Sequence, residues 1–156
     1  MDIRARVEEV EIRIDRAAER TGRKRSDIKL LAVTKTHGVD VIKAALSAGI
    51  EFIGENKVQE AGTKIPLLTG LYKEFHYIGH LQTNKINKLL NLNPSLIHSI
   101  DNLHLAEKLN SRLVAAGKIQ DILLQVNTSG EESKFGVEPE AAAELAGKIL
   151  ECENLN

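Results

Sequence analysis

Several residue types that support common functions are scarce or absent in this chain. Its 156 residues include no tryptophan, and only 3% are aromatic, which argues against a surface on which nucleic-acid bases stack. Cys152 is the only cysteine, so no disulfide can form within the chain, and we expect a reducing, cytoplasmic environment. No apolar run approaches the roughly 18 residues of a membrane span, and we expect no signal peptide. The formal net charge of -1 likewise predicts no nucleic-acid and no membrane partner.

The chain also lacks the motifs of several large enzyme classes. It contains no Walker loop, no G-x-G-x-x-G fingerprint and no G-x-S-x-G elbow, so nucleotide hydrolysis, dinucleotide binding and serine hydrolysis lose support. His76 and His80 have the i, i+4 spacing of some zinc ligands, but they fall on a predicted strand and turn, without a third ligand in a recognisable pattern. We therefore expect no bound metal.

What the chain does contain is a regular alternation of apolar segments. An amphipathic helix is predicted over residues 2–21, because apolar residues recur there at intervals of three and four. The predicted strands are 29–34, 51–54, 75–79, 96–100 and 121–126, and the predicted helices are 39–48, 56–68, 82–91, 102–116 and 138–151. Asp101 is expected to cap the helix at 102–116, and Pro139 suits the first turn of the last helix.

The order of these segments predicts an α/β fold with a parallel sheet. Strands and helices alternate at the spacing of βα units, and no Asn-Gly or Asp-Gly hairpin signal separates two strands. Parallel strands need a crossover connection, which the predicted helices provide. Since 42% of the residues are hydrophobic, the chain is expected to form one core and a single domain, residues 1–156.

A lysine directly follows the first predicted strand. The run LLAV at 30–33 is apolar without clean alternation, so we interpret it as buried, and Lys35 then lies near the carboxyl end of the strand, where α/β folds place their chemistry. Desolvation and nearby cations would lower the pKa of such an amine, and its neutral form attacks carbonyl groups to give a Schiff base. The structural alternative is a lysine that extends to solvent from the strand end.

Polar residues and glycines also follow the other predicted strands. Asn56 comes after the second strand, Asp101 follows the fourth and Asn127 follows the fifth. Because the carboxyl ends of parallel strands meet at one rim, these residues together indicate a site there. Asn56 would either hold a ligand oxygen or cap the next helix, and capping is the commoner role. Gly79 would let a ligand approach the backbone, or it would simply relieve a tight turn.

Five sets of residues occur in a fixed order along the chain. They are LAVTK at 31–35, GEN and VQE within 54–60, HYIG and LQTNK within 76–85, HSID at 98–101, and VN and KFG within 126–136. In this order they resemble the pyridoxal phosphate homeostasis proteins, which are single-domain relatives of the alanine racemase N-terminal barrel. The resemblance runs from the first helix to residue 156. It implies a parallel (β/α) barrel of the TIM type, here an incomplete barrel with about five βα units after an N-terminal helix.

The resemblance also implies a cofactor and its site. Lys35 would hold pyridoxal 5′-phosphate (PLP) as a Schiff base, and Asn56, His76 and Gly79 match positions near the cofactor in the family pattern. Lys134 matches a lysine in the family's loop after the fifth strand and is assigned to the same site. Members of the family are regarded as carriers or regulators of cellular PLP, so no established catalytic activity is expected. The implied partners are PLP and PLP-dependent apoenzymes.

The chain departs from the family pattern at its end. A sixth strand would begin near residue 156, and the later strands of the family barrel hold the cofactor phosphate. We therefore expect the C-terminal strands to be missing from this single domain, PLP binding to be weakened, and open sheet edges to favour self-association. His80 stands where many members have proline, which affects the local turn geometry.

Other functions remain compatible with the residues. A PLP-dependent racemase-type enzyme would need a second acid/base group, commonly a tyrosine from another domain, and Tyr72 and Tyr77 are the only tyrosines. A cofactor-free aldolase would use Lys35 directly on a carbonyl substrate. An inert fragment or binding module would not respond to the loss of Lys35.

Overall fold

The computed structural model describes residues 2–131 and 133–156, and in this part of the chain five short strands alternate with helices. The strands are β1 (Leu31–Val33), β2 (Phe52–Glu55), β3 (Glu74–Tyr77), β4 (Leu96–Ile100) and β5 (Ile122–Leu124). The helices are α1 (Ile3–Arg20), α2 (Val39–Ser47), α3 (Val58–Lys64), α4 (Ile86–Leu90), α5 (Leu103–Ala116) and α6 (Ala142–Ile149). Turns of 3-10 helix occur at Arg25–Asp27, Ile65–Leu68, Thr83–Lys85 and Pro139–Ala141.

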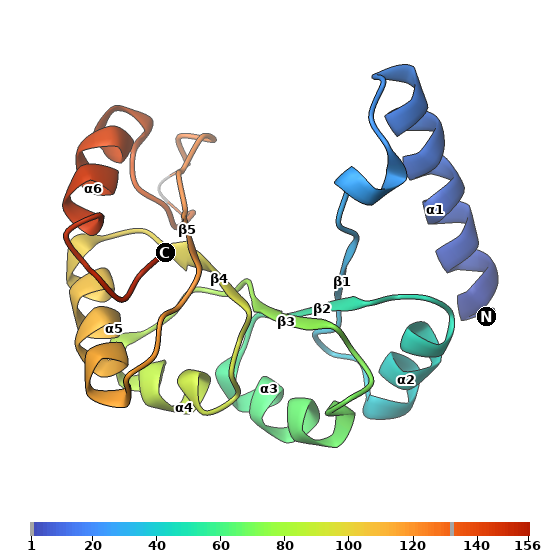
Figure 1. The fold of residues 1–156 in the computed structure, drawn as a ribbon, viewed down its shortest axis with the longest axis horizontal. Helices are drawn as coiled ribbons and strands as arrows, with labels where there is room; N and C mark the ends of the chain where they lie inside the picture. The colour runs from blue at the N-terminus through green and yellow to red at the C-terminus, as the bar shows by residue number, and fades with distance from the viewer. Residues whose placement is uncertain (1, 132) are drawn as a thin grey trace.

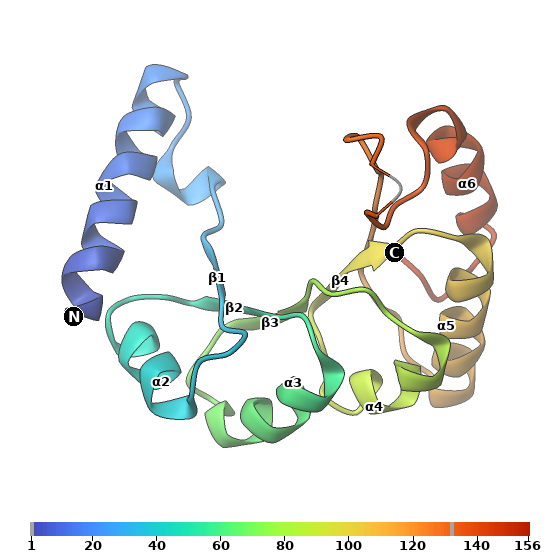
Figure 2. The ribbon, with the colours of Figure 1, turned by 180° about the vertical axis from the view of Figure 1, so that it is seen from behind.

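The strands form one parallel sheet in the order in which they occur along the chain. Each strand pairs with the next in parallel, from β1 through β5. The sheet is curved, and helices α2 to α5 lie along its convex side, while α1 and α6 stand at the two ends of the arc (Figures 1 and 2). The prediction of a parallel α/β sheet is confirmed, and the shape is an arc of a (β/α) barrel.

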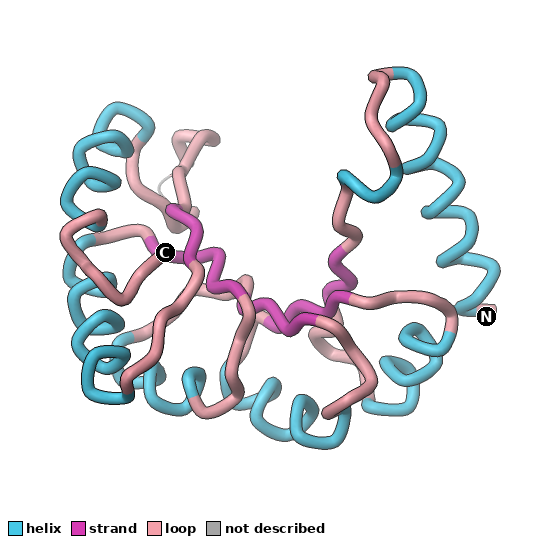
Figure 3. The backbone as a smooth tube through the Cα atoms, in the orientation of Figure 1, coloured by secondary structure: helices cyan, strands magenta, loops and turns pink. Residues whose placement is uncertain are grey.

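The two faces of the sheet have different neighbours. The outer face, which we define by Ile53, Phe75 and Ile97, packs against the helices, and each of these side chains is at most 1% exposed. The inner face is defined by the register Val33, Gly54, His76 and Leu96 on adjacent strands. It lies on the concave side, where the tube trace shows no helix over the strands (Figure 3). Side chains alternate between these faces along each strand.

The interpretation of the first strand as buried is wrong. The side chains of Leu31 and Ala32 are only partly buried, and Val33 is 45% exposed. The reason is that β1 is an edge strand, which pairs with β2 on one side and with no described strand on the other. The concave face also leaves Val33 without a covering layer. An apolar run therefore marks the strand correctly but not its degree of burial.

The N-terminal helix is also less covered than its apolar stripe predicts. In α1 only Ala18 is buried, and Val10 is 39% exposed. The helix packs through Val7 against the core at its N-terminal half, next to α2, and its other half extends away from the sheet (Figure 1). The side chain of Asp2 caps it by accepting hydrogen bonds from the backbone of Arg4 and Ala5.

The expected cap of α5 is one residue off. Asn102, not Asp101, is the N-cap, and its Oδ1 accepts the backbone N–H of Leu105 at 2.9 Å. The carboxylate of Asp101 instead accepts a hydrogen bond from the Asn102 side chain at 2.7 Å. Pro139 does begin the turn that leads into α6, as predicted.

Candidate functional site

The turn after β1 presents Lys35 at the carboxyl end of that strand. The side chain of Lys35 is exposed, whereas the preceding Thr34 is buried. The following Thr36 has a φ of 65°, a left-handed conformation that β-branched residues rarely adopt. The burial that the sequence led us to expect around Lys35 is therefore not supplied by the described residues, and its ammonium group is open to ligands.

Three charged side chains lie beneath this turn, and we call Glu55, Glu60 and Lys64 the turn cluster. Glu55 ends β2 and is fully buried, and Lys64 is 7% exposed. Lys64 Nζ donates to Glu55 Oε1 at 3.0 Å and to Glu60 Oε1 at 2.5 Å. Burial acts to lower the pKa of Lys64, but its hydrogen bonds to Glu60 and Glu55 outweigh this and raise the pKa above its usual value. Lys64 therefore keeps its charge.

Asn56, directly after β2, has an amide that the fold does not use. The N-cap of α3 is Lys57, which makes no side-chain cap, so the expectation that Asn56 caps this helix is wrong. The Asn56 Oδ1 is buried and has no hydrogen-bond partner among the described residues. Such an orphaned acceptor costs roughly 1–3 kcal/mol, and a polar ligand group would relieve that cost. The other interpretation from the sequence, a ligand-binding Asn56, is the one this geometry favours.

Gly79 lies against the backbone of Asn56. A Cβ atom added to Gly79 would lie 2.0 Å from the backbone oxygen of Asn56, so no other residue fits there without moving the chain. This close approach accounts for the glycine without a ligand. Its effect is to fix the ends of β2 and β3 against each other, and thereby to place the Asn56 amide.

His76, on the inner face of β3, belongs to a chain of polar side chains. Its Nε2 lies 2.8 Å from Glu74 Oε2, and its Nδ1 lies 2.9 Å from Nε2 of His98 on β4. Lys29 Nζ donates to the same Glu74 oxygen at 2.6 Å. These hydrogen bonds from Lys29 and His76 lower the pKa of Glu74, so it stays ionised and can only accept.

These contacts suggest one order of protons when both histidines are neutral. In a neutral His76 the proton resides on Nε2, facing Glu74, and Nδ1 accepts from the Nε2–H of His98. Burial, followed by the nearby charge of His76, lowers the pKa of His98. Both ring nitrogens of His76 are therefore occupied, and because the residue is 3% exposed, only a small part of its ring could meet a cofactor.

Lys134 lies in the loop between β5 and α6, and its side chain is exposed. Its Nζ is 3.9 Å from Glu131, a weak contact within the loop. The next residue, Phe135, stacks on the ring of His80 with the ring centroids 3.9 Å apart. This stack connects the loop to the end of β3.

The structure places the five predicted site residues within or after the carboxyl-terminal parts of β1, β2, β3 and β5, and it brings Asn56 and Gly79 into contact. Lys35 and Asn56 follow the adjacent strands β1 and β2, and Gly79 packs on Asn56. His76 is one strand further along the sheet, and Lys134 belongs to the loop after β5. The exposed amine and the unused amide fit the reactive end of a polar carbonyl cofactor such as PLP.

The sequence reasoning assigned no role to the turn cluster or to Glu74. The sequence nevertheless contains one spacing that points to each of them. Glu60 and Lys64 have the i, i+4 spacing of helical ion pairs, and Glu74 precedes His76 by two residues on one strand face. The pairing of Lys64 with Glu55 depends on how α3 packs on the sheet.

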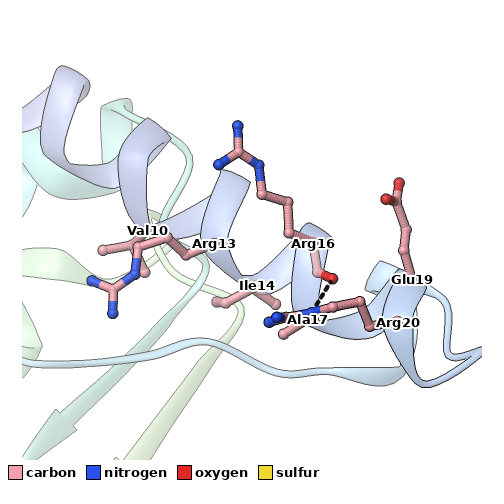
Figure 4. A pocket seen from close by; sticks show the side chains of 7 residues that line it. All are labelled: Val10, Arg13, Ile14, Arg16, Ala17, Glu19 and Arg20. Carbon is pink, nitrogen blue, oxygen red and sulfur yellow. Dashed lines mark hydrogen bonds between the residues drawn. The ribbon is translucent and has the colours of Figure 1, made fainter.

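A separate hollow of about 880 Å³ lies along α1, away from this rim. Its lining comes from that single helix, where Arg20 folds back to donate to the backbone oxygen of Arg16 (Figure 4). The other lining residues are Val10, Arg13, Ile14, Ala17 and Glu19. Within residues 2–131 and 133–156, no helix is long and apolar enough to cross a membrane. That same part of the chain holds no group of three His, Cys, Asp or Glu side chains placed to bind a metal ion.

Comparison with known proteins identifies relatives that belong to one family. The family model of the alanine racemase N-terminal domain matches residues 7–156. The pyridoxal phosphate homeostasis protein of Aquifex aeolicus is 43% identical over 143 residues, covering 92% of this chain and 62% of the relative. That of Helicobacter pylori is 42% identical over 157 residues, covering 99% of this chain and 70% of the relative. The chain thus spans less than two thirds of the length of the Aquifex relative.

Solved structures match the fold. A protein from Bifidobacterium adolescentis has a TM-score of 0.92 at 39% identity, covering 99% of this chain and 66% of that one. PipY of Synechococcus elongatus, solved with PLP bound, has a TM-score of 0.76 at 30% identity, covering 92% of this chain and 66% of PipY. An alanine racemase from Clostridium difficile, at 15% identity, shares the fold with a TM-score of 0.69 over 83% of this chain and 34% of the racemase. The chain belongs to the alanine racemase N-terminal domain family and, within it, to the pyridoxal phosphate homeostasis proteins.

Proposed function

We propose that this chain binds PLP as part of a protein of intracellular PLP homeostasis, with Lys35 holding the cofactor as a Schiff base. The observation that carries the proposal is the pair formed by the exposed Lys35 amine and the unused amide of Asn56, at the ends of adjacent strands. The PLP-bound structure of the similar PipY supports it. No catalytic turnover by this chain is part of the proposal.

The residues of the rim have distinct roles in this proposal. The neutral amine of Lys35 condenses with the aldehyde of PLP, so that a C=N bond forms and water leaves. The Asn56 amide hydrogen-bonds a polar substituent of the ring, and His76, whose ring nitrogens are engaged, packs by the small exposed part of its ring. Lys134, which is exposed in the loop after β5, adds positive charge that would attract the phosphate.

The test is a PLP titration followed by visible absorption. A saturable band is expected in the parent chain, and it should be lost in Lys35→Ala, because the covalent bond needs that amine. Lys43→Ala, which removes an exposed lysine from α2, is the matched control and should titrate like the parent. Equal bands in the parent and in Lys35→Ala would overturn the proposal.

Partners and location belong to the same proposal. We expect PLP-dependent apoenzymes to receive the cofactor, and a cytoplasmic location in keeping with the free, buried Cys152. We expect self-association through the edge of β1, where Val33 is 45% exposed, because the edge of β5 already pairs with the C-terminal residues, as in the 2.9 Å hydrogen bond from the Ile122 N–H to the Asn156 backbone oxygen. Sedimentation of the chain across a concentration series tests self-association, and a concentration-independent monomer would contradict it.

The racemase-type alternative finds less support in the geometry. Tyr77 is 2% exposed on the outer face, and its hydroxyl donates to the backbone oxygens of His80 and Asn56 at 3.2 and 3.4 Å. Burial raises its pKa to about 12. A phenol with these partners and this pKa is poorly suited to exchange protons with a ligand on the inner face.

A further inference from the structure

The turn cluster binds the backbone on both sides of Lys35. Lys64 Nζ donates to the backbone oxygen of Thr34 at 2.9 Å, and the Thr34 hydroxyl donates to Glu55 Oε1 at 2.7 Å. On the other side, Glu60 Oε1 accepts the backbone N–H of Thr36 at 2.6 Å. The residues before and after Lys35 are thus held by side chains from β2 and α3, while Lys35 itself stays exposed.

Burying the charges of the turn cluster costs free energy. Two buried charges must leave water, and apolar residues of similar volume often serve stability equally well or better. The second oxygen of Glu55, Oε2, is also buried and has no partner among the described residues. Stability alone does not account for the desolvation of these charges and for the unpartnered oxygen. The contacts of the cluster with the Lys35 turn do account for them.

The turn needs such support because of the conformation of Thr36. A left-handed φ at a β-branched residue is strained and persists only where the surroundings impose it. The Glu60 carboxylate supplies a charge-assisted hydrogen bond to the Thr36 amide. Without it, the turn would relax toward an ordinary φ and carry the Lys35 Cα with it.

We propose that Glu60 and Lys64 are positioning residues, which lock the Thr34–Thr36 turn and thereby hold the Lys35 amine where it meets its aldehyde ligand. This inference rests on the proposed function of Lys35 and goes beyond it. Neither residue touches the ligand. Glu60 holds the turn directly, and Lys64 holds both the Thr34 backbone oxygen and the Glu60 carboxylate.

The test compares two substitutions at one position. Glu60→Ala removes the acceptor of the Thr36 amide, whereas Glu60→Gln retains an oxygen that can accept it. In Glu60→Ala we expect hydrogen exchange at the Thr36 amide to rise at least about tenfold, and the rate of Lys35 reaction with PLP to fall at least about tenfold, since small misplacements have effects of this size. Glu60→Gln should stay within about threefold of the parent in both measurements.

The control is Glu144→Ala, because Glu144 and Lys148 form an i, i+4 pair of similar length, 2.6 Å, on the exposed side of α6. It should leave both readouts unchanged. Ile65→Val, at the buried residue directly after α3, tests whether a general loss of stability has the same effect, and it should not. All rates are measured at a temperature at which circular dichroism shows every variant folded.

The outcomes separate this inference from the proposed function. Retained Thr36 protection in Glu60→Ala, or lost protection with an unchanged Lys35 rate, would overturn the positioning role. If the parent itself forms no band that depends on Lys35, the proposed function fails. In that case, Lys35 labelling by a simple aldehyde, trapped with borohydride and located by mass spectrometry, decides the positioning role: slower labelling in Glu60→Ala upholds it, and equal labelling rejects it.

Discussion

The two faces of the sheet are both largely buried at β3, yet they carry different chemistry. On the outer face, Phe75 and Tyr77 pack under the helices and are 1% and 2% exposed. On the inner face, Glu74 and His76 form a polar chain with His98. Parallel strands usually present apolar residues on both faces. The contrast teaches that at β3 the helix-covered face contributes apolar packing to the core, whereas the concave face carries a hydrogen-bonded polar chain.

The largest loss of stability is expected for a substitution on the outer face. Phe75→Ala removes a side chain that is 1% exposed, and we expect a loss of about 3–5 kcal/mol in the free energy of unfolding, measured by urea denaturation. On the inner face, Val33→Ala should cost less than about 1 kcal/mol, because Val33 is 45% exposed. Equal losses for the two variants would refute the contrast between the faces.

At alkaline pH the outer face should respond first. Burial raises the pKa of Tyr77 to about 12, above the ordinary value of 10.0, so the unfolded chain loses this proton more readily than the folded one. Its contribution to stability is complete below pH 10 and is lost as the pH rises toward 12. Thermal unfolding between these limits should show the decline, and Tyr77→Phe should reduce it.

At acid pH the inner face should respond first, with a smaller effect. The pKa of His98 is lowered by burial and then by the charge of His76, so the unfolded chain binds a proton at a higher pH than the folded one. The stabilising contribution is complete above pH 6.5 and falls as the pH drops below it. His98→Gln should flatten the stability profile just below pH 6.5, and an unchanged slope would show that other groups cause it.

Glu74 extends the acid response to a lower range. Hydrogen bonds from Lys29 and then His76 lower its pKa from 4.5, so its contribution is present above that value and is lost as the pH falls further. The two ranges allow the histidine pair and its carboxylate partner to be observed separately in one titration. His98→Gln should alter only the upper range.

Much of the architecture followed from local patterns. Apolar runs separated by helical periodicity located the five strands to within a few residues, and the absence of hairpin signals gave the parallel order. The position of Lys35 after the first run placed it at the strand end. These features depend on residues near one another in the chain, so the sequence alone contains them.

Contacts between distant residues required the tertiary structure. The weak burial of β1 depends on its place at the sheet edge, and the unused amide of Asn56 depends on the cap of α3 being its neighbour Lys57. The hydrogen bond between His76 and His98 forms only because β3 lies beside β4 in the sheet.

The sequence by itself determined the order and type of the elements and the amine at the rim, because strand and helix periodicity and turn chemistry act over a few residues. Only the tertiary structure decided that Lys64 turns from α3 onto Glu55 and Thr34, which are 9 and 30 residues away in the chain. Burial, ion pairing and backbone strain arise where separate elements meet. The contacts between these elements determine how the Lys35 turn is held.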